Sequence, residues 1–136
     1  MTALTNYTEN NIINHIFRSG SFTKPSALYV GLITSLSDGE AGSITEVTGG
    51  SYARVSRAPL DANWNASTTT GTTANTATLQ FPTATADWGT CTHFGIWDAI
   101  TGGNLLIYAP LVAARTITTG TTPSFGAGAL TFQVDN

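Results

Sequence analysis

Two short segments in which apolar and polar residues strictly alternate constrain the fold of this chain more than any other feature. In 76–81 (TATLQF) the residues Ala, Leu and Phe alternate with Thr and Gln, and 130–134 (LTFQV) has the same pattern. Successive side chains of a β-strand point to opposite faces, so a period of two predicts half-buried strands. The residues TTGTT precede both segments, at 69–73 and 118–122. This repeat is compatible with coincidence in a Thr-rich chain or with two equivalent hairpins.

Further strands are expected where apolar residues are bounded by turn residues. The segment 27–33 is apolar on both faces, which is typical of a centrally buried strand, and 51–58 alternates up to Pro59, a residue confined to strand ends and sheet edges. A hairpin is expected from 91–97 and 105–112. About seven or eight short strands result, so the sequence predicts a mainly β fold, an antiparallel β-sandwich of jelly-roll type. Composition agrees, because only 10% of residues are charged, against about 25% on average, and β-branched Thr suits strand surfaces.

One helix is expected near the N-terminus. Thr5 or Asn6 can cap it, and Gly20 ends it. Four apolar residues recur at helical spacing and form one stripe: Ile12, Ile13, Ile16 and Phe17. We therefore expect a single domain with an N-terminal helical arm at 1–20 and a sandwich at 21–136. The stripe can be buried on a partner or on the sandwich of the same chain, and both interpretations stay open here.

The stretch 86–106 concentrates the residues that resemble an active site. Cys91 and His93 share one face of a strand but project in parallel, about 6.5 to 7 Å apart, whereas a nucleophile and its base need about 2.6 to 3.2 Å. Asp98 has the opposite parity, and one Cys with one nearby His is too small a set for structural zinc. The packing interpretation assigns Phe94 and Ile96 to one face, and Cys91, His93 and Trp97 to the other, with Gly95 leaving room for an aromatic ring. We predict no catalytic, metal-binding or cofactor-binding residues.

The end of that stretch predicts a structural turn. Asp98 is placed to accept backbone N–H groups, and Gly102 and Gly103 can adopt the positive φ angles that a tight hairpin turn requires. The strand before this turn and the strand after it would then pair as a hairpin.

Charge excludes two classes of partner. Net charge is −3, with five Lys and Arg residues scattered along the chain. Nucleic-acid binding requires clustered cations, and a membrane-surface helix requires a basic face, so neither partner is expected. The first residues lack the basic and apolar regions of a signal peptide, which predicts synthesis and folding in the cytoplasm. A surface with so few charges has little electrostatic protection against association, which favours a protein that works inside an assembly.

Several motifs, in this order along the chain, resemble a known family. They are the segment 4–34, GGSYAR at 49–54, WGTCTHFGIWDAITGGNLL at 88–106 and FGAGALTF at 125–132. The series is similar to small structural proteins of tailed-bacteriophage virions, labelled as tail-fibre proteins or as head decoration (cement) proteins. The resemblance covers nearly the whole chain. It implies a non-enzymatic virion protein without catalytic residues, made in the host cytoplasm and located on the capsid surface or the tail.

Two virion roles are then expected, with different partners. The leading hypothesis is a decoration protein, a homotrimer that binds the major capsid protein or other virion proteins and stabilises the head lattice, with the stripe Ile12, Ile13, Ile16 and Phe17 as its docking arm. The alternative is a tail-fibre or baseplate module that binds a receptor or carbohydrate. Trp64, with Asp61, Asn63 and Asn65 nearby, would suit sugar stacking, or else Trp64 anchors its loop on the sheet. A small enzyme is a third hypothesis, but the chain lacks a convergent acid, base and nucleophile.

Overall fold

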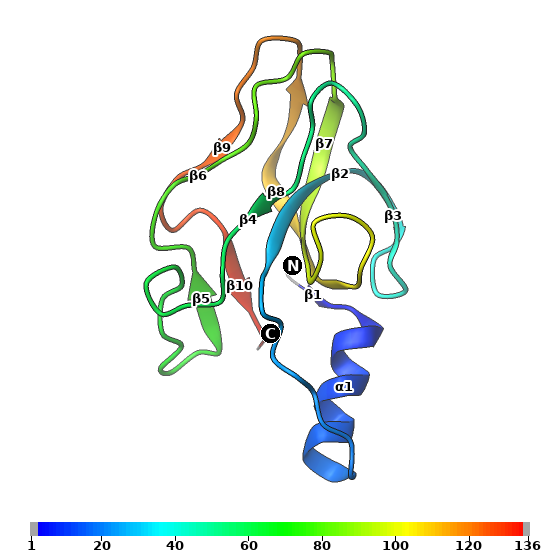
Figure 1. The fold of residues 1–136 in the computed structure, drawn as a ribbon, viewed down its shortest axis with the longest axis vertical. Coiled ribbons are helices and arrows are strands. Elements are labelled where there is room, and N and C mark those ends of the chain that lie inside the picture. The colour runs from blue at the N-terminus through cyan, green and yellow to red at the C-terminus, as the bar shows by residue number, and fades with distance from the viewer. Residues whose placement is uncertain (1–2, 135–136) are drawn as a thin grey trace.

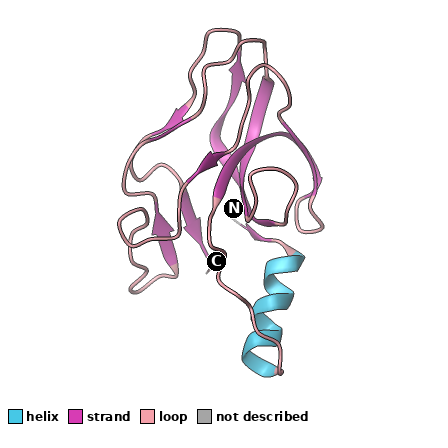
Figure 2. Ribbon diagram, in the orientation of Figure 1, coloured by secondary structure: helices cyan, strands magenta, loops and turns pink. Residues whose placement is uncertain are grey.

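A computed structural model describes residues 3–134 as a β-sandwich with one helix projecting from it (Figures 1 and 2). This confirms the predicted fold class. The described residues contain ten strands, many only two to four residues long, instead of seven or eight. The elements are β1 (Ala3–Leu4), α1 (Asn6–Phe17), β2 (Tyr29–Asp38), β3 (Ser43–Glu46), β4 (Val55–Ser56), β5 (Thr72–Ala74), β6 (Leu79–Gln80), β7 (Gly89–Trp97), β8 (Leu105–Ile117), β9 (Ser124–Phe125) and β10 (Thr131–Gln133).

The main sheet is antiparallel, in the order β1-β8-β7-β2-β3, and β4 also pairs with β2. At its centre Gly31 of β2 lies opposite Gly95 of β7. A Cβ atom on Gly31 would lie 2.8 Å from the Trp97 ring, and one on Gly95 would lie 2.7 Å from it. The two glycines therefore make room for Trp97, which is the role that the sequence predicted for Gly95.

The second layer consists of two short ribbons, β5 with β10 and β6 with β9. β5 includes the last two residues of the first TTGTT repeat, and β9 follows the second repeat. Each of these strands pairs with the Leu-x-Phe strand that comes after the other repeat. Both repeats make turns, with φ of +60° at Gly71 and +87° at Gly120. The repeat thus marks two segments that pair with each other, rather than two separate hairpins.

Buried Asn75 joins these two segments. Its side-chain Oδ1 accepts from the Leu130 amide at 2.8 Å, and its Nδ2 donates to the carbonyls of Ala77 and Gly126. An amide side chain with no exposure is stable only when it is hydrogen-bonded in this way. Asn75 therefore fixes the register of the second layer from inside the core.

The core between the layers is rich in aromatic rings. Tyr52 meets Trp88 edge-on at 5.2 Å between ring centroids, and Phe125 lies 6.2 Å from Phe81 and 5.7 Å from Phe94. Phe94 comes from the main sheet and Phe81 and Phe125 from the second layer. Such offset and edge-on pairs stabilise beyond the area that they bury, so these rings hold the two layers together.

Two sequence predictions about strands were wrong in detail. The segment predicted as a strand at 51–58 is paired only at β4, because Ser51 has a φ of +63° and the Tyr52 amide closes a turn on the Gly49 carbonyl. The strand predicted at 105–112 extends to Ile117. By contrast, the helix begins where predicted, with Thr5 as its N-cap. It ends at Phe17 with Arg18 as its C-cap, before the predicted end at Gly20.

Candidate functional site

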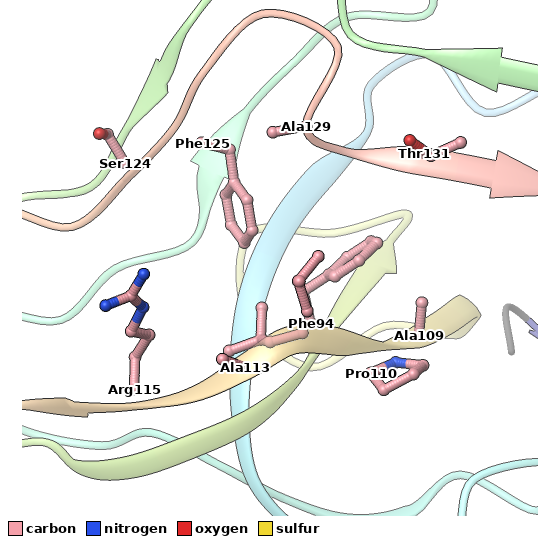
Figure 3. Close-up of a pocket in the computed structure, with 11 residues that line it drawn as sticks. Phe94, Ala109, Pro110, Ala113, Arg115, Ser124, Phe125, Ala129 and Thr131 are labelled. Carbon is pink, nitrogen blue, oxygen red and sulfur yellow. The ribbon is translucent and has the colours of Figure 1, made fainter.

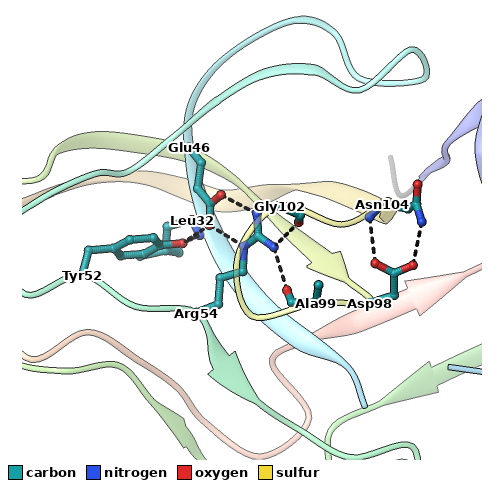
Figure 4. Close-up of polar contacts among 8 residues, drawn as sticks. All are labelled: Leu32, Glu46, Tyr52, Arg54, Asp98, Ala99, Gly102 and Asn104. Atoms are coloured by element: carbon teal, nitrogen blue, oxygen red, sulfur yellow. Dashed lines mark hydrogen bonds and ion pairs between the residues drawn. The ribbon is translucent and has the colours of Figure 1, made fainter. Parts of the chain in front are cut away.

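The most elaborate polar site in the molecule is centred on Arg54 (Figure 4). Its guanidinium forms a bidentate ion pair with the Glu46 carboxylate, at 2.8 Å to Oε1 and 2.7 Å to Oε2. The other guanidinium nitrogen donates to the carbonyls of Ala99 and Gly102, at 2.7 and 2.8 Å. The guanidinium also lies 4.0 Å above the Trp97 ring. A planar cation with five donors suits this combination of fork, carbonyl and ring contacts. Arg54 thereby attaches the loop 98–104 to the main sheet.

Tyr52 completes this cluster. Its hydroxyl donates to Glu46 Oε1 at 2.7 Å and accepts from the Leu32 amide at 2.9 Å. Burial, and then the Glu46 carboxylate, raise the pKa of Tyr52 far above its ordinary value. Tyr52 is consequently a neutral donor at physiological pH. Tyr52, Glu46 and Arg54 all direct their polar atoms at one another or at backbone groups, so the cluster braces a loop.

The 98–104 loop is also held from within. The Asp98 carboxylate accepts from the Asn104 amide at 2.7 Å and from its side-chain Nδ2 at 2.8 Å. Gly102 and Gly103 have φ of +60° and +71°. A Cβ on Gly103 would lie 2.5 Å from Asp98 Oδ1, whereas one on Gly102 would meet nothing within 4 Å. The three residues that the sequence assigned to a structural turn are thus brought together in one turn.

Cys91 and His93 are separated by an irregularity that the sequence did not reveal. The β7–β8 register shifts between them, since Cys91 pairs with Arg115 and His93 pairs with Pro110. Cys91 lies in the main core with Phe94, so its predicted place on the Trp97 face was wrong. Burial raises the pKa of the Cys91 thiol and lowers the pKa of His93. Within residues 3–134, no three His, Cys, Asp or Glu side chains group closely enough to hold a metal ion.

The helical arm is attached to the sandwich only at its base. Thr5 and Thr8 donate through their hydroxyls to the carbonyls of Leu105 and Leu106, at 2.6 and 2.8 Å, and the Asn6 amide donates to the Glu40 carbonyl at 2.9 Å. Beyond this attachment α1 extends away from the sandwich (Figure 1). Of the predicted stripe, Ile12 is half-buried. The other three are exposed, at 54% for Ile13, 63% for Ile16 and 78% for Phe17. The stripe is therefore not buried on the chain's own sandwich.

A second exposed apolar surface lies along β8 (Figure 3). The register shift bulges residues 111–114 away from β7, and the Val112 side chain is fully exposed. Beside the bulge is an open hollow of about 450 Å³ between β8 and the segment 124–131. Phe94 and Phe125 project into it, and Arg115 lies at one end. Among the described residues the outer edge of β8 pairs only with β1, at Ile107 and Tyr108, so the remainder is a free sheet edge.

Trp64 lies elsewhere, away from the arm. Its indole N–H donates to the Ala58 carbonyl at 3.2 Å, and the half-buried ring packs against the main core. It also borders a shallow hollow of about 380 Å³ with Leu60, Asp61 and Asn65. Trp64 thus anchors its loop and still presents part of its surface to that hollow.

Sequence reasoning missed the Arg54 cluster. The motif GGSYAR contains both Tyr52 and Arg54, and their alternation was interpreted as a strand pattern. The available signal was that Arg54, one of only five cations, stands two residues after Tyr52, a spacing at which side chains in extended backbone point in the same direction. Their common partner, Glu46, is the last residue of β3, so the pairing becomes visible only in three dimensions.

The comparisons with known proteins assign the chain to a family. The family described as Podophage GP4 fiber I protein gp80 matches residues 3–133. The chain belongs to this family and is a structural protein of a phage virion, as the resemblance implied. No curated protein matched the chain significantly. No helix of the described residues is long and apolar enough to cross a membrane.

Proposed function

We propose that this phage virion protein is the subunit of a small, non-enzymatic homotrimeric fibre on the virion, in which the α1 arm makes the contacts between chains. The observation that carries the proposal is the exposed stripe of Ile13, Ile16 and Phe17 on an arm that its own sandwich leaves uncovered. Contiguous exposed apolar residues mark interaction sites in soluble proteins. The name of the matching family, a fiber I protein, supports the position on a fibre.

The low charge and the free β8 edge support the same proposal. An unpaired sheet edge is a ready template for pairing with another chain, and proteins often protect such edges with charged residues, especially lysine, or with proline. Of these, β8 contains Pro110 and Arg115 but no lysine. Val112 is fully exposed there, and the chain has a single lysine, Lys24, outside the sheet. We propose that this edge is covered by a neighbouring virion protein in the assembled particle.

A decoration protein on the head lattice is the second candidate. It is supported by the same observations of low charge and several shallow contact surfaces, because a cement protein binds through many such contacts. The candidates differ in copy number. A decoration protein repeats over the whole head surface, whereas fibre subunits occupy a few symmetric positions.

A cryo-electron microscopy map of the virion tests this choice. The fibre proposal expects density for the sandwich and its projecting arm in a few trimeric appendages, and copy numbers by quantitative mass spectrometry far below those of the major capsid protein. Density spread evenly over the head, with copy numbers comparable to the capsid protein, would establish the decoration role instead.

We propose a sugar-binding role for the hollow beside Trp64 in the fibre. A partly exposed aromatic face with the Asp61 carboxylate and the Asn65 amide beside it supplies stacking and hydrogen-bonding groups. Binding of purified protein to host surface polysaccharide, compared with the Asp61→Ala and Asn65→Ala variants, tests it. These two residues are exposed, so the variants leave the loop anchor intact. Equal binding by all three proteins would assign Trp64 to loop anchoring alone.

A further inference from the structure

We infer that the end of the α1 arm docks into a hollow at the arm base of a second copy of this chain, in a head-to-tail contact that three copies close into a ring. The arm tip is defined by Ile13, Ile16, Phe17, Arg18 and Lys24. The base hollow is lined by residues that include Tyr7, Glu40, Ile44, Trp97 and Leu105. The inference rests on the proposed self-assembly, and it is independent of the choice between fibre and head.

The arm tip combines apolar surface with positive charge. Its three apolar side chains are each more than half exposed. Arg18 directly follows the helix. The Phe22 amide donates to His15 Nδ1 at 3.3 Å, which places Phe22 beside the last turn, and Lys24 follows two residues later in the returning segment. Within residues 3–134 neither cation takes part in an ion pair.

The base hollow has a mainly polar lining that also contains apolar side chains and an exposed carboxylate. It is an open cavity of about 510 Å³ beside the start of α1, with the aromatic and aliphatic side chains of Tyr7, Ile44 and Leu105 in its lining. Glu40 lies on its rim and is exposed. The only cation in its lining, Arg54, is already neutralised by Glu46.

Two more carboxylates strengthen the negative charge near this hollow. Asp38 and Glu40 flank Gly39, which packs on the Tyr108 ring. Glu9 lies in the first turn of α1, which begins at the Glu40 carbonyl. In keeping with this placement, the three charges add to burial in raising the pKa of Tyr108. All three are exposed. Three exposed carboxylates thus lie at the base of the arm and the exposed cation Arg18 lies at its tip. Other exposed charges, such as Asp61 and Arg115, lie elsewhere on the sandwich.

The two surfaces cannot meet within one chain. A helix of twelve residues is about 18 Å long at a rise of 1.5 Å per residue, and α1 begins at the Glu40 carbonyl and points away from it. The apolar hollow along β8 is a poorer receptor for the tip, because its one charged lining residue is Arg115, which would repel Arg18 and Lys24. Charge complementarity thus selects the base hollow of another copy.

A contact between two different surfaces is heterologous, and it closes into a ring when the rotation between copies allows. The tip alone exposes a few hundred Å², less than the roughly 800 Å² per partner of a standard interface. In a ring each copy makes two such contacts, once through its tip and once through its base. This is how a short arm can hold a trimer together.

Charge reversal tests the inference on the full-length purified chain. Sedimentation velocity would be measured for the wild type, for Arg18→Glu, for Glu40→Lys and for the chain that carries both changes. Each single reversal replaces attraction with repulsion and should weaken trimer formation by at least about tenfold in dissociation constant, as the loss of a complementary interface charge does. The double reversal should restore trimer formation. Arg115→Glu and Asp61→Lys are matched controls, because they reverse exposed charges away from the arm, and they should assemble like the wild type.

Phe17→Ser supplies a test that does not depend on charge. Phe17 is 78% exposed, so the variant should keep the wild-type circular dichroism and thermal midpoint while its trimer dissociates. A monomeric wild type, or a double reversal that stays dissociated, would overturn the head-to-tail contact. So would tip variants that assemble normally, or a monomer that binds vesicles of anionic phospholipid through the tip. These measurements use purified protein without virions. If the proposed position of the protein on a fibre is wrong, the trimer measured here should still form.

Discussion

The braced loop 98–104 and the α1 arm differ in how many of their contacts are made within the chain. The loop is held by buried Arg54, which contacts a carboxylate, two carbonyls of the loop and an aromatic ring. In the arm, hydrogen bonds from Thr5, Asn6 and Thr8 hold the base, and most of the apolar residues further along are exposed. The polar groups that hold the loop find their hydrogen-bond partners within the chain, so substitutions there should lower the free energy of unfolding. Most apolar residues of the arm are exposed, and the proposed assembly covers them with another molecule, so substitutions there should weaken assembly.

Arg54→Ala should have the largest effect on stability. It leaves the partly buried Glu46 carboxylate without its cation and frees two loop carbonyls. Removing one partner of a buried ion pair costs about 3 to 5 kcal/mol of unfolding free energy, and we expect the lower end, because the Glu46 side chain keeps 19% exposure. Urea denaturation would measure it. Arg115→Ala is the control and should stay within about 0.5 kcal/mol of the wild type. Equal losses in both variants would contradict the bracing role.

Replacing each turn glycine by valine should separate backbone strain from steric overlap. Both positions have positive φ, which costs a non-glycine residue roughly 1 to 2 kcal/mol. Gly103→Val should lose more unfolding free energy than Gly102→Val, because only at position 103 would a Cβ collide with Asp98 and Ala99. Thermal denaturation of the two variants measures the difference. A Gly103→Val protein as stable as the wild type would show that the loop is looser than its contacts indicate.

The double variant Cys91→Ala, His93→Gln should lose only packing. Cys91 is fully buried, so removal of its sulfur leaves a small cavity, and we expect a loss of about 1 to 2 kcal/mol at most. Trimer formation and virion incorporation should stay at wild-type levels. A folded double variant that no longer assembles would contradict the structural interpretation of these residues.

The arm should give the smallest change in stability. Ile13→Ser combined with Ile16→Ser removes apolar surface that is already exposed, so the free energy of unfolding should stay within about 0.5 kcal/mol of the wild type. Assembly should nevertheless be lost, which sedimentation would detect. Ile12→Ser is an informative comparison, because half-buried Ile12 should affect stability as well. A large loss of stability in the first variant would place the stripe in a contact within the chain.

Deletion of residues 1–20 extends this comparison to the whole arm. The deleted chain should keep the circular dichroism of a β-rich protein, since β1 pairs with β8 at only two positions. It should bind virions more weakly than the full chain in an incorporation assay. Loss of the β signal would show that β1 and the base contacts are needed for the sandwich to fold.

Local signals in the sequence determined the elements that depend on local interactions. Thr5 caps α1 through its own side chain, the paired glycines turn the chain because they tolerate positive φ, and alternation at β6 and β10 marked strands with one buried face. The tertiary structure decided how these elements combine. Arg54 and Tyr52 became a brace because Glu46 reaches them from another strand, and a register shift moved Cys91 into the core.

The exposure of the stripe on α1 was likewise decided only in three dimensions. An amphipathic pattern predicts which side chains of a helix form the apolar face. It does not identify the surface that covers this face, which can belong to the same chain or to another molecule. Here Thr5 and Thr8 bind the carbonyls of β8 and direct the helix away from the sandwich. The sequence by itself therefore determined a helix with an apolar stripe, and the hydrogen bonds at its base decided that most of the stripe stays exposed.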